Sequence, residues 1–167
     1  MKVAKLPGQR CAVLRLRAAD ADLLARANGA LGALLPLDAN RANGDLLWLA
    51  PGEWLLVDCS EEVLKRLGDA LDRATFHIAD ITHGRMALSL TGAPARALLA
   101  RGCSLDLHPR AFPHGSCAQS VFAQIPAIIH FRSDTPEYRL YLDSSFEAYA
   151  MAWLCRAAAF FPGIELP

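Results

Sequence analysis

An acidic residue and a histidine that lie close together in the sequence could carry acid–base chemistry. Asp80 precedes His83 by three residues, and Thr82 and Gly84 flank the histidine. A carboxylate that bonds to an imidazole can orient it as a general base. The same stretch is also typical of a turn, because polar side chains beside glycine often bond to their own backbone. We favour the turn and predict no catalytic residue here.

A second group of reactive side chains surrounds a proline-rich loop. His108 and His114 flank the loop, and Asp106, Cys103 and Cys117 lie near them in the sequence. A cysteine beside a histidine can act as a nucleophile, and the same side chains can bind zinc. Their spacing matches neither motif. We therefore predict no metal site, and a Cys/His enzyme built on Cys103, His108 and Cys117 is a weaker alternative.

The remaining reactive side chains fit structural roles. His130 lies in the apolar run 128–131, where alternation places it on the solvent or partner side of a strand. Cys117, at the start of a strand, is typical of a small buried thiol. The glycines of the second half are too widely spaced for a phosphate-binding loop. We therefore predict no dinucleotide-binding site.

Composition argues against several classes of function. The 167 residues carry 17 basic and 17 acidic side chains, so the formal net charge is zero, which argues against a nucleic-acid partner. The start of the sequence lacks the apolar run of a signal peptide, and the uncharged run 111–131 is too polar for a membrane span. Five cysteines without a C-x-x-C pair indicate reduced thiols. We expect a cytoplasmic protein with no membrane partner.

Hydrophobic periodicity predicts a similar order of strands and helices in each half of the chain. The first half reads as strand, helix, hairpin, helix and strand, over residues 9–16, 21–34, 46–57, 61–71 and 76–81. The second half reads as a strand, a helix, three strands and a helix, over residues 85–90, 94–101, 117–122, 127–131, 138–142 and 144–161. Asp20 and Ser60 are predicted helix caps, Gly102 a left-handed C-cap, and Ser144 with Glu147 a capping box.

This pattern predicts an α+β fold. Each half resembles a split βαβ unit of the ferredoxin-like kind, in which helices cover one face of a largely antiparallel sheet. The pseudo-repeats span about 9–81 and 85–161. We expect them to form one compact module within a single domain over residues 1–167, since a chain of this length suits one domain.

Two segments carry a resemblance to a known family. Residues 101–113, RGCSLDLHPRAFP, followed by GSCAQ at 115–119, resemble a signature of the gamma subunit of heterotetrameric sarcosine oxidase. Residues 47–56, LWLAPGEWLL, are similar to the same family's L-G-P-D-E-W-L-L segment, with Ala50 in place of glycine and Gly52 in place of aspartate. The resemblance extends from about residue 40 to residue 161.

The resemblance implies a non-catalytic structural subunit, with a fold similar to the folate-binding domain of aminomethyltransferases. It implies a complex that converts sarcosine, oxygen and tetrahydrofolate to glycine, hydrogen peroxide and methylenetetrahydrofolate. The partners would be the alpha, beta and delta subunits, with alpha as the main contact. The resemblance implies that this chain binds no cofactor of its own and that the partners bind FAD, FMN, NAD, zinc and tetrahydrofolate. The alternative is a stand-alone folate or one-carbon module, or an aminomethyltransferase-like protein, with a polar pocket near Asp80 and Arg85.

A subunit of such a complex needs a surface that binds protein. Phe112 lies between Arg110 and Pro113 in the stiff proline-rich loop, where a preordered apolar side chain would lose little entropy on docking. Arg110 could pair with a carboxylate of the partner. We predict Arg110 and Phe112 as partner-binding residues. The alternative is that Phe112 fills the core of its own domain, and a chain without its partner could form a homo-oligomer.

Overall fold

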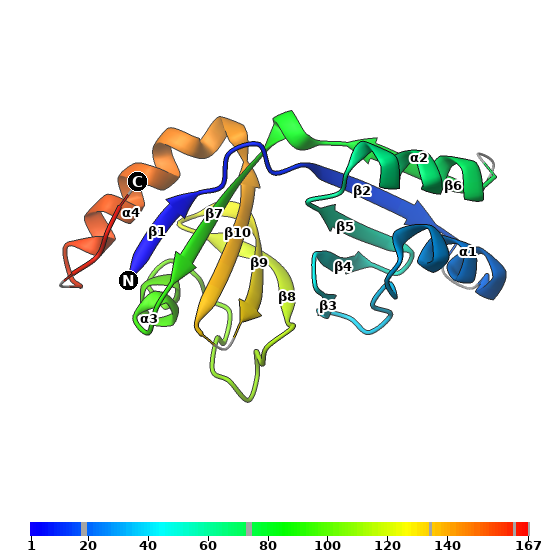
Figure 1. Ribbon diagram of the computed structural model, residues 1–167. Coiled ribbons are helices and arrows are strands. Elements are labelled where there is room, and N and C mark those ends of the chain that lie inside the picture. The colour runs from blue at the N-terminus through cyan, green and yellow to red at the C-terminus, as the bar shows by residue number, and fades with distance from the viewer. Residues whose placement is uncertain (18–19, 73–74, 134, 162, 167) are drawn as a thin grey trace. The chain divides into compact units, whose positions relative to one another are not determined.

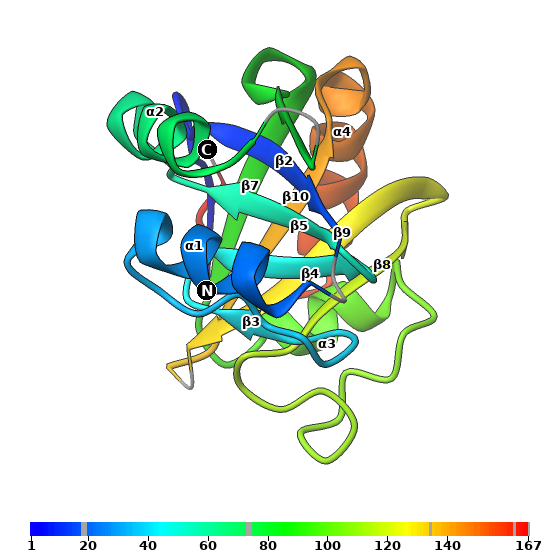
Figure 2. The same cartoon turned by 90° about the vertical axis from the view of Figure 1, so that its right-hand side faces the viewer.

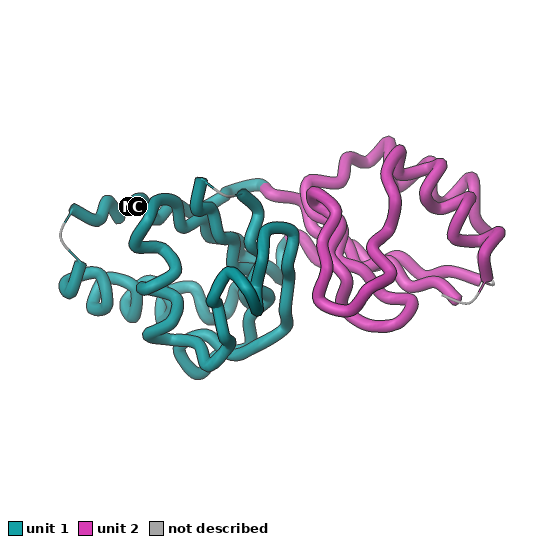
Figure 3. The backbone as a smooth tube through the Cα atoms, turned by 90° about the horizontal axis from the view of Figure 1, so that it is seen from below, with its two compact units in different colours: residues 1–8, 83–167 teal, residues 9–82 magenta. Residues whose placement is uncertain are grey.

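The computed structural model describes residues 1–17, 20–72, 75–133, 135–161 and 163–166. The chain divides into two compact units, which Figure 3 shows in different colours. Unit 2 comprises Gln9–Thr82, and unit 1 comprises Met1–Gly8 together with His83–Pro167. Each unit has its own cluster of buried apolar side chains between its sheet and its helices.

Unit 2 is an antiparallel sheet with two helices (Figure 1). Its elements are β2 (Cys11–Leu16), α1 (Ala21–Leu31), β3 (Ala42–Asn43), β4 (Leu46–Ala50), β5 (Glu53–Val57), α2 (Glu61–Ala70) and β6 (Phe76–Asp80). The strands lie in the order β3-β4-β5-β2-β6. The predicted hairpin is confirmed: β4 pairs with β5, Trp48 lies opposite Trp54, and Gly52 at the reversal has a φ of 77°.

The helices of unit 2 begin where the sequence predicts. Side-chain oxygens of Asp20 and Ser60 accept backbone N–H bonds from the first turns of α1 and α2. The prediction that the first helix reaches residue 34 is wrong. The helix ends at Leu31 because Gly32 takes the left-handed conformation, with a φ of 71°, and Leu34 is 68% exposed.

The core of unit 2 is centred on one tryptophan. Trp54 is 1% exposed, and its indole Nε1 donates a hydrogen bond to the carbonyl oxygen of Pro36 at 2.7 Å. Leu23 of α1 and Leu67 of α2 belong to the same buried cluster. The helices therefore cover the sheet face from which Trp54 projects.

Unit 1 is a second antiparallel sheet, and its strands lie in the order β1-β7-β10-β9-β8. Its elements are β1 (Lys2–Lys5), the 3₁₀ turn η1 (Thr82–Gly84, whose first residue belongs to unit 2), β7 (Arg85–Thr91), α3 (Ala95–Ala100), β8 (Cys117–Phe122), β9 (Ile125–Ser133), β10 (Glu137–Asp143), the 3₁₀ turn η2 (Ser144–Phe146) and α4 (Glu147–Ala158). Leu98 and Leu99 of α3, Leu154 of α4, and Ile129 and Leu140 of the sheet share one core.

Strand β1 was not foreseen from the sequence. It pairs with β7, and Val3, which is 1% exposed, lies opposite Leu90. Its sequence is KVAK, so only one side chain enters the core between two lysines. Four residues with one buried apolar position give too short a pattern for an alternation to be recognised.

Two predicted helix caps in unit 1 are wrong. Gly102 does not take the left-handed conformation, and α3 ends through Arg101 in the right-handed helical region. Ser144 does not cap the last helix either, because its hydroxyl donates to the carbonyl oxygen of His83 at 3.1 Å. Asp143 takes that role for the turn before α4, where its Oδ1 accepts a bond from the backbone N–H of Ser145 at 2.9 Å.

The two antiparallel sheets with their helices make this an α+β protein, as the sequence predicts. In unit 2, β2 lies between β5 and β6; in unit 1, β7 lies between β10 and β1. The edge strand beside β2 is therefore β6, from the end of unit 2. The edge strand beside β7 is β1, from the N-terminus of the chain. Within the described residues, no helix is both long and apolar enough to cross a bilayer.

Candidate functional site

The proline-rich loop joins α3 to β8 (Figure 2). Hydrogen bonds within the loop hold its conformation. Oδ1 of Asp106 accepts a bond from the N–H of His108 at 2.9 Å, and Nδ1 of His108 accepts one from the N–H of Arg110 at 3.2 Å. The carbonyl oxygen of His108 also accepts bonds from the N–H groups of Ala111 and Phe112. Asp106 and His108 therefore stabilise turns of the loop.

The structure separates the two predicted partner-binding residues. Phe112 is 4% exposed and belongs to the core of unit 1 together with Leu107. The expectation that Phe112 is an exposed anchor is therefore wrong, because its ring fixes the loop to the unit that carries it. Arg110 is exposed, and in the described part of the chain no acidic side chain pairs with it.

The cysteines and histidines of this region serve the fold. The thiol of Cys103 lies 3.5 Å from Oγ of Ser120 and accepts a bond from the N–H of Leu105 at 3.3 Å. Nε2 of His114 lies 2.7 Å from the carbonyl oxygen of Arg132. Across the described ranges, no three His, Cys, Asp or Glu side chains gather as a metal site would need. These contacts give no support to a zinc site or a Cys/His nucleophile.

A pocket of about 430 Å³ opens beside the loop. It is lined by Ala93, Arg96, Pro109, Pro113, His114, Phe131, Pro136 and Tyr138. The rings of Phe131 and Tyr138 are stacked, with centroids 4.6 Å apart and planes at 13°, and His114 meets Phe131 edge-on at 6.1 Å. Prolines and stacked rings make rigid walls, so the pocket keeps its shape without a ligand.

The pocket carries one permanent charge. The guanidinium of Arg96 is exposed, and its positive charge favours the phenolate form of Tyr138. Burial is the larger effect, and the pKa of Tyr138 is raised above its ordinary value. Tyr138 therefore stays a neutral phenol at physiological pH. The lining can hold an apolar group beside an anion, and it brings together no nucleophile and oriented base.

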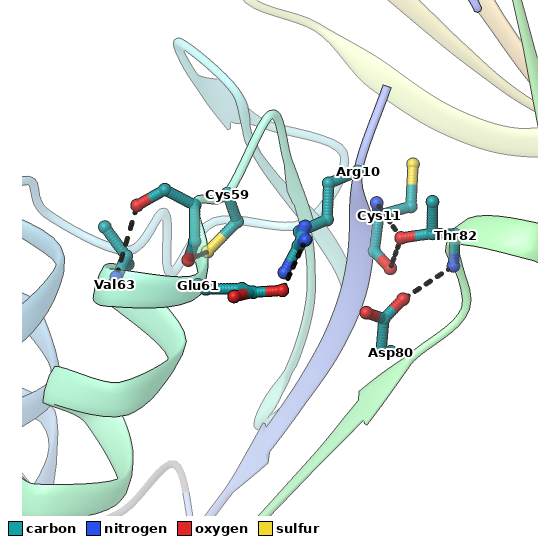
Figure 4. A network of polar contacts seen from close by, with 8 residues as sticks. Arg10, Cys11, Cys59, Glu61, Val63, Asp80 and Thr82 are labelled. Atoms are coloured by element: carbon teal, nitrogen blue, oxygen red, sulfur yellow. Dashed lines mark hydrogen bonds and ion pairs between the residues drawn. The ribbon is translucent and has the colours of Figure 1, made fainter. Parts of the chain in front are cut away.

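Asp80 lies at a turn and takes part in its hydrogen bonding (Figure 4). Its Oδ1 accepts a bond from the N–H of Thr82 at 2.9 Å. Oγ1 of Thr82 in turn accepts a bond from the N–H of Cys11 at 3.1 Å, which ties the turn to β2. His83 is exposed, in the 3₁₀ turn η1. These contacts agree with the turn that the sequence favours.

Nearby in unit 2, Arg10 pairs with Glu61 at 3.0 Å (Figure 4). The thiol of Cys59 is 6% exposed, and burial raises its pKa, with the charge of Arg10 acting in the opposite direction. A raised pKa keeps this sulfur as a thiol, which is a poor nucleophile. Cys59 is therefore a structural residue.

His130 departs from its prediction in one respect. It alternates with Ile129 and Phe131, which belong to the core of unit 1, so the strand pattern is as expected. The expected solvent exposure is wrong, since His130 is 2% exposed. Burial, and to a smaller extent the charges of Arg132 and His114, lower its pKa to about 4. The imidazole is therefore neutral at physiological pH.

Comparison with solved structures first defines the class of fold. The chain superimposes on aminomethyltransferase T of the glycine cleavage system from Bartonella henselae with a TM-score of 0.68, over 99% of this chain and 47% of that one. The sequence identity is 16%. This likeness shows that the chain shares the fold of part of an aminomethyltransferase.

The sequence defines the family within that class. Residues 15–160 match the model of the sarcosine oxidase, gamma subunit family. The chain is 29% identical to the sarcosine oxidase subunit gamma of Corynebacterium sp. strain U-96, over 99% of this chain and 88% of that protein. It is also 29% identical to the corresponding subunit of an Arthrobacter species, over 77% and 66%. This chain belongs to the sarcosine oxidase gamma subunit family.

The structures agree with the sequences. The chain superimposes on a chain of the heterotetrameric sarcosine oxidase of Corynebacterium sp. U-96 with a TM-score of 0.89 and 26% identity, over 99% of this chain and 87% of that one. The family resemblance of the two sequence segments is thereby confirmed.

Proposed function

We propose that this chain is a non-catalytic structural subunit of a heterotetrameric sarcosine oxidase. The family match over residues 15–160 is the observation that carries the proposal. The complex would oxidise sarcosine with oxygen and transfer the one-carbon unit to tetrahydrofolate, giving glycine, hydrogen peroxide and methylenetetrahydrofolate. Its alpha, beta and delta subunits would bind FAD, FMN, NAD, zinc and tetrahydrofolate. This chain would pack mainly on alpha.

The candidate site supports a structural role. The loop histidine His108 is used for turn formation, and the thiol of Cys103 contacts Ser120 and a backbone N–H. The pocket beside the loop offers apolar walls and the charge of Arg96.

Arg110 is the residue of the loop that we propose as a partner contact. It is exposed, and the turns made by Asp106 and His108 fix the backbone beneath it. A guanidinium on a rigid loop can form a bidentate pair with a partner carboxylate at low entropic cost. Phe112 acts indirectly, because its buried ring holds the loop on unit 1.

We also propose that residues 1–167 act as one module made of two pseudo-repeated, ferredoxin-like units. The proposal is supported by β2 and β7, which hold matching positions in their sheets. Each lies between an edge strand and a strand that belongs to a hairpin. A cytoplasmic location fits the five cysteines, which are thiols and not disulfides, since a reducing compartment would preserve them in this state.

A stand-alone folate or one-carbon module is the second candidate, and the fold shared with aminomethyltransferase T favours it. One experiment separates the two. The tagged chain is co-expressed with the alpha, beta and delta subunits of its own organism, and the eluate is examined by gel and by visible absorption. Co-purified subunits with a flavin spectrum are expected. A colourless, solitary chain that binds a reduced folate would support the stand-alone module instead.

The same experiment tests Arg110. Arg110→Ala should lower the yield of the assembled complex while the unfolding temperature of the chain stays unchanged, because the side chain is exposed. Arg66→Ala, at an exposed position of α2, is the matched control. Assembly of the Arg110→Ala variant at the wild-type level would remove Arg110 from the interface.

A further inference from the structure

A row of large side chains runs along α4. Tyr149, Trp153 and Arg156 follow one another at intervals of four and three residues, which places them on one face of α4, and Phe160 lies two residues after the end of the helix. Tyr149 is 42% exposed and Phe160 is 68% exposed. Arg101, which follows α3, meets this row, and its guanidinium lies 4.2 Å from the centroid of the Phe160 ring. These five residues are called the α4 surface below.

The α4 surface is hollowed. Arg101, Trp153, Arg156, Ala157 and Phe160 line a pocket of about 290 Å³. The aromatic rings and the stems of the arginines give it apolar walls. Its size fits one large apolar side chain and leaves room for the polar groups beside it.

The walls of this pocket are held in place before anything binds. The indole of Trp153 meets the ring of Phe122 edge-on, with centroids 4.9 Å apart and planes at 71°. Gly102 lies so close to the indole that a Cβ atom at this position would be 2.8 Å from its Cη2 atom. The cation–π contact between Arg101 and Phe160 restrains the remaining wall. A surface ordered in this way loses little entropy on docking.

Among the described residues of unit 1, no acidic side chain pairs with the charges of the α4 surface. Arg101 and Arg156 are exposed, and over the described residues neither forms an ion pair with an acidic side chain. Trp, Tyr and Arg are the side chains that most often dominate the energy of protein interfaces. Two guanidinium groups beside an apolar pocket are complementary to carboxylates that flank an apolar side chain.

We propose that the α4 surface is a docking site for another subunit of the complex, at a place where that subunit presents an apolar side chain flanked by carboxylates. The proposal rests on the proposed function. The apolar side chain enters the pocket between Trp153 and Phe160, and the carboxylates pair with Arg101 and Arg156. A second copy of this chain is a poor occupant, because symmetric pairing of the same patch would bring the arginines of both copies together.

Two independent variants test this surface in the co-expression experiment. Phe160→Ala removes a wall of the pocket, and Arg156→Glu reverses one charge. Both positions are exposed, so the variants should unfold at about the wild-type temperature. Each should weaken association of the chain with the other subunits by about tenfold or more, as expected for interface hot spots. Trp153 is left unchanged because it packs on Phe122.

The controls match each change in chemistry. Val121→Ala truncates an apolar side chain that is 49% exposed on β8, and Arg66→Glu reverses an exposed charge on α2. Both should assemble as the wild type does.

Wild-type assembly of Phe160→Ala and Arg156→Glu would overturn the docking site and leave the proposed function standing. Failure of the unmodified chain to co-purify would overturn the proposed function itself. Self-association of the isolated chain that these two variants abolish, with normal assembly, would assign the surface to a second copy and refute the proposal.

Discussion

The indole of Trp153 lies so close to Gly102 that a Cβ atom at this position would be 2.8 Å from Cη2 of the tryptophan. The same atom would be 2.9 Å from Cε2 of Phe122. Both neighbours are rings packed edge-on against each other, so neither can move away without disturbing the other. The requirement for glycine here is therefore steric, and it links the family-like segment 101–113 to helix α4.

Gly102→Ala should destabilise the chain by about 1–3 kcal/mol, the usual cost of forcing extra atoms into a packed core. Gly68→Ala is a matched control, because Gly68 lies in α2 and a Cβ atom added there would meet no atom within 4 Å. That change should stabilise the chain by roughly 0.5–1 kcal/mol through helix propensity. Urea unfolding of both variants measures the difference. Equal effects of the two substitutions would contradict the steric argument.

The sequence predicts helices and strands correctly where their hydrophobic pattern extends over many residues. Helix starts at Asp20 and Ser60 and the hairpin around Gly52 follow from local chemistry that acts within a few residues. The turn between β8 and β9 could not be found in this way. It is made by Ala123 and Gln124, with φ values of 51° and 70°, and neither residue type signals a turn. The strand then begins at Ile125, so the predicted start of this strand at residue 127 is wrong.

The candidate site was harder to predict than the fold. The stiff loop is predicted by its prolines, but the pocket that Pro109 and Pro113 help to line was not predicted from the sequence. The direction of the Phe112 ring was not predictable, because a loop has no periodicity that tells an inward residue from an outward one. The burial of His130 depends on the tertiary contacts of its strand, and the local sequence does not contain that information.

The sequence predicts Ser144 as the cap before the last helix, whereas the structure shows Asp143 in that role. Oδ1 of Asp143 accepts bonds from the N–H and the hydroxyl of Ser145, whereas Ser144 bonds to a distant carbonyl. Asp143→Ala should therefore lower the unfolding temperature at neutral pH more than Ser144→Ala does. Differential scanning calorimetry of the two variants tests this. The reverse order would restore the capping box predicted from Ser144 and Glu147.

The effect of Asp143 should also depend on pH. Its bonds to Ser145, with the charge of Arg85 as a smaller cause, lower the pKa of its carboxyl below the ordinary value of 3.8. A carboxyl whose pKa is lower in the folded state stabilises the fold above the unfolded-state value, and it loses this effect as the pH falls through the folded-state value. The difference between wild type and Asp143→Ala should therefore narrow below pH 3.8.

His130 should make the chain less stable in mild acid. Its pKa in the folded chain is about 4, against an ordinary value of 6.5. Between these values the unfolded chain binds a proton that the folded chain does not, so stability falls as the pH falls from 6.5 towards 4. The full effect is on the order of 3 kcal/mol, from the free energy that corresponds to each pKa unit.

A neutral replacement isolates this contribution. His130→Gln removes the titrating group from β9, and the variant should show a shallower loss of stability between pH 6.5 and pH 4 than the wild type. His83→Gln, at an exposed position, should keep the wild-type dependence. Urea unfolding at several pH values in this window measures all three chains. Parallel curves for the wild type and His130→Gln would show that the imidazole binds its proton equally in the folded and unfolded chains, and that the burial of His130 does not shift its pKa.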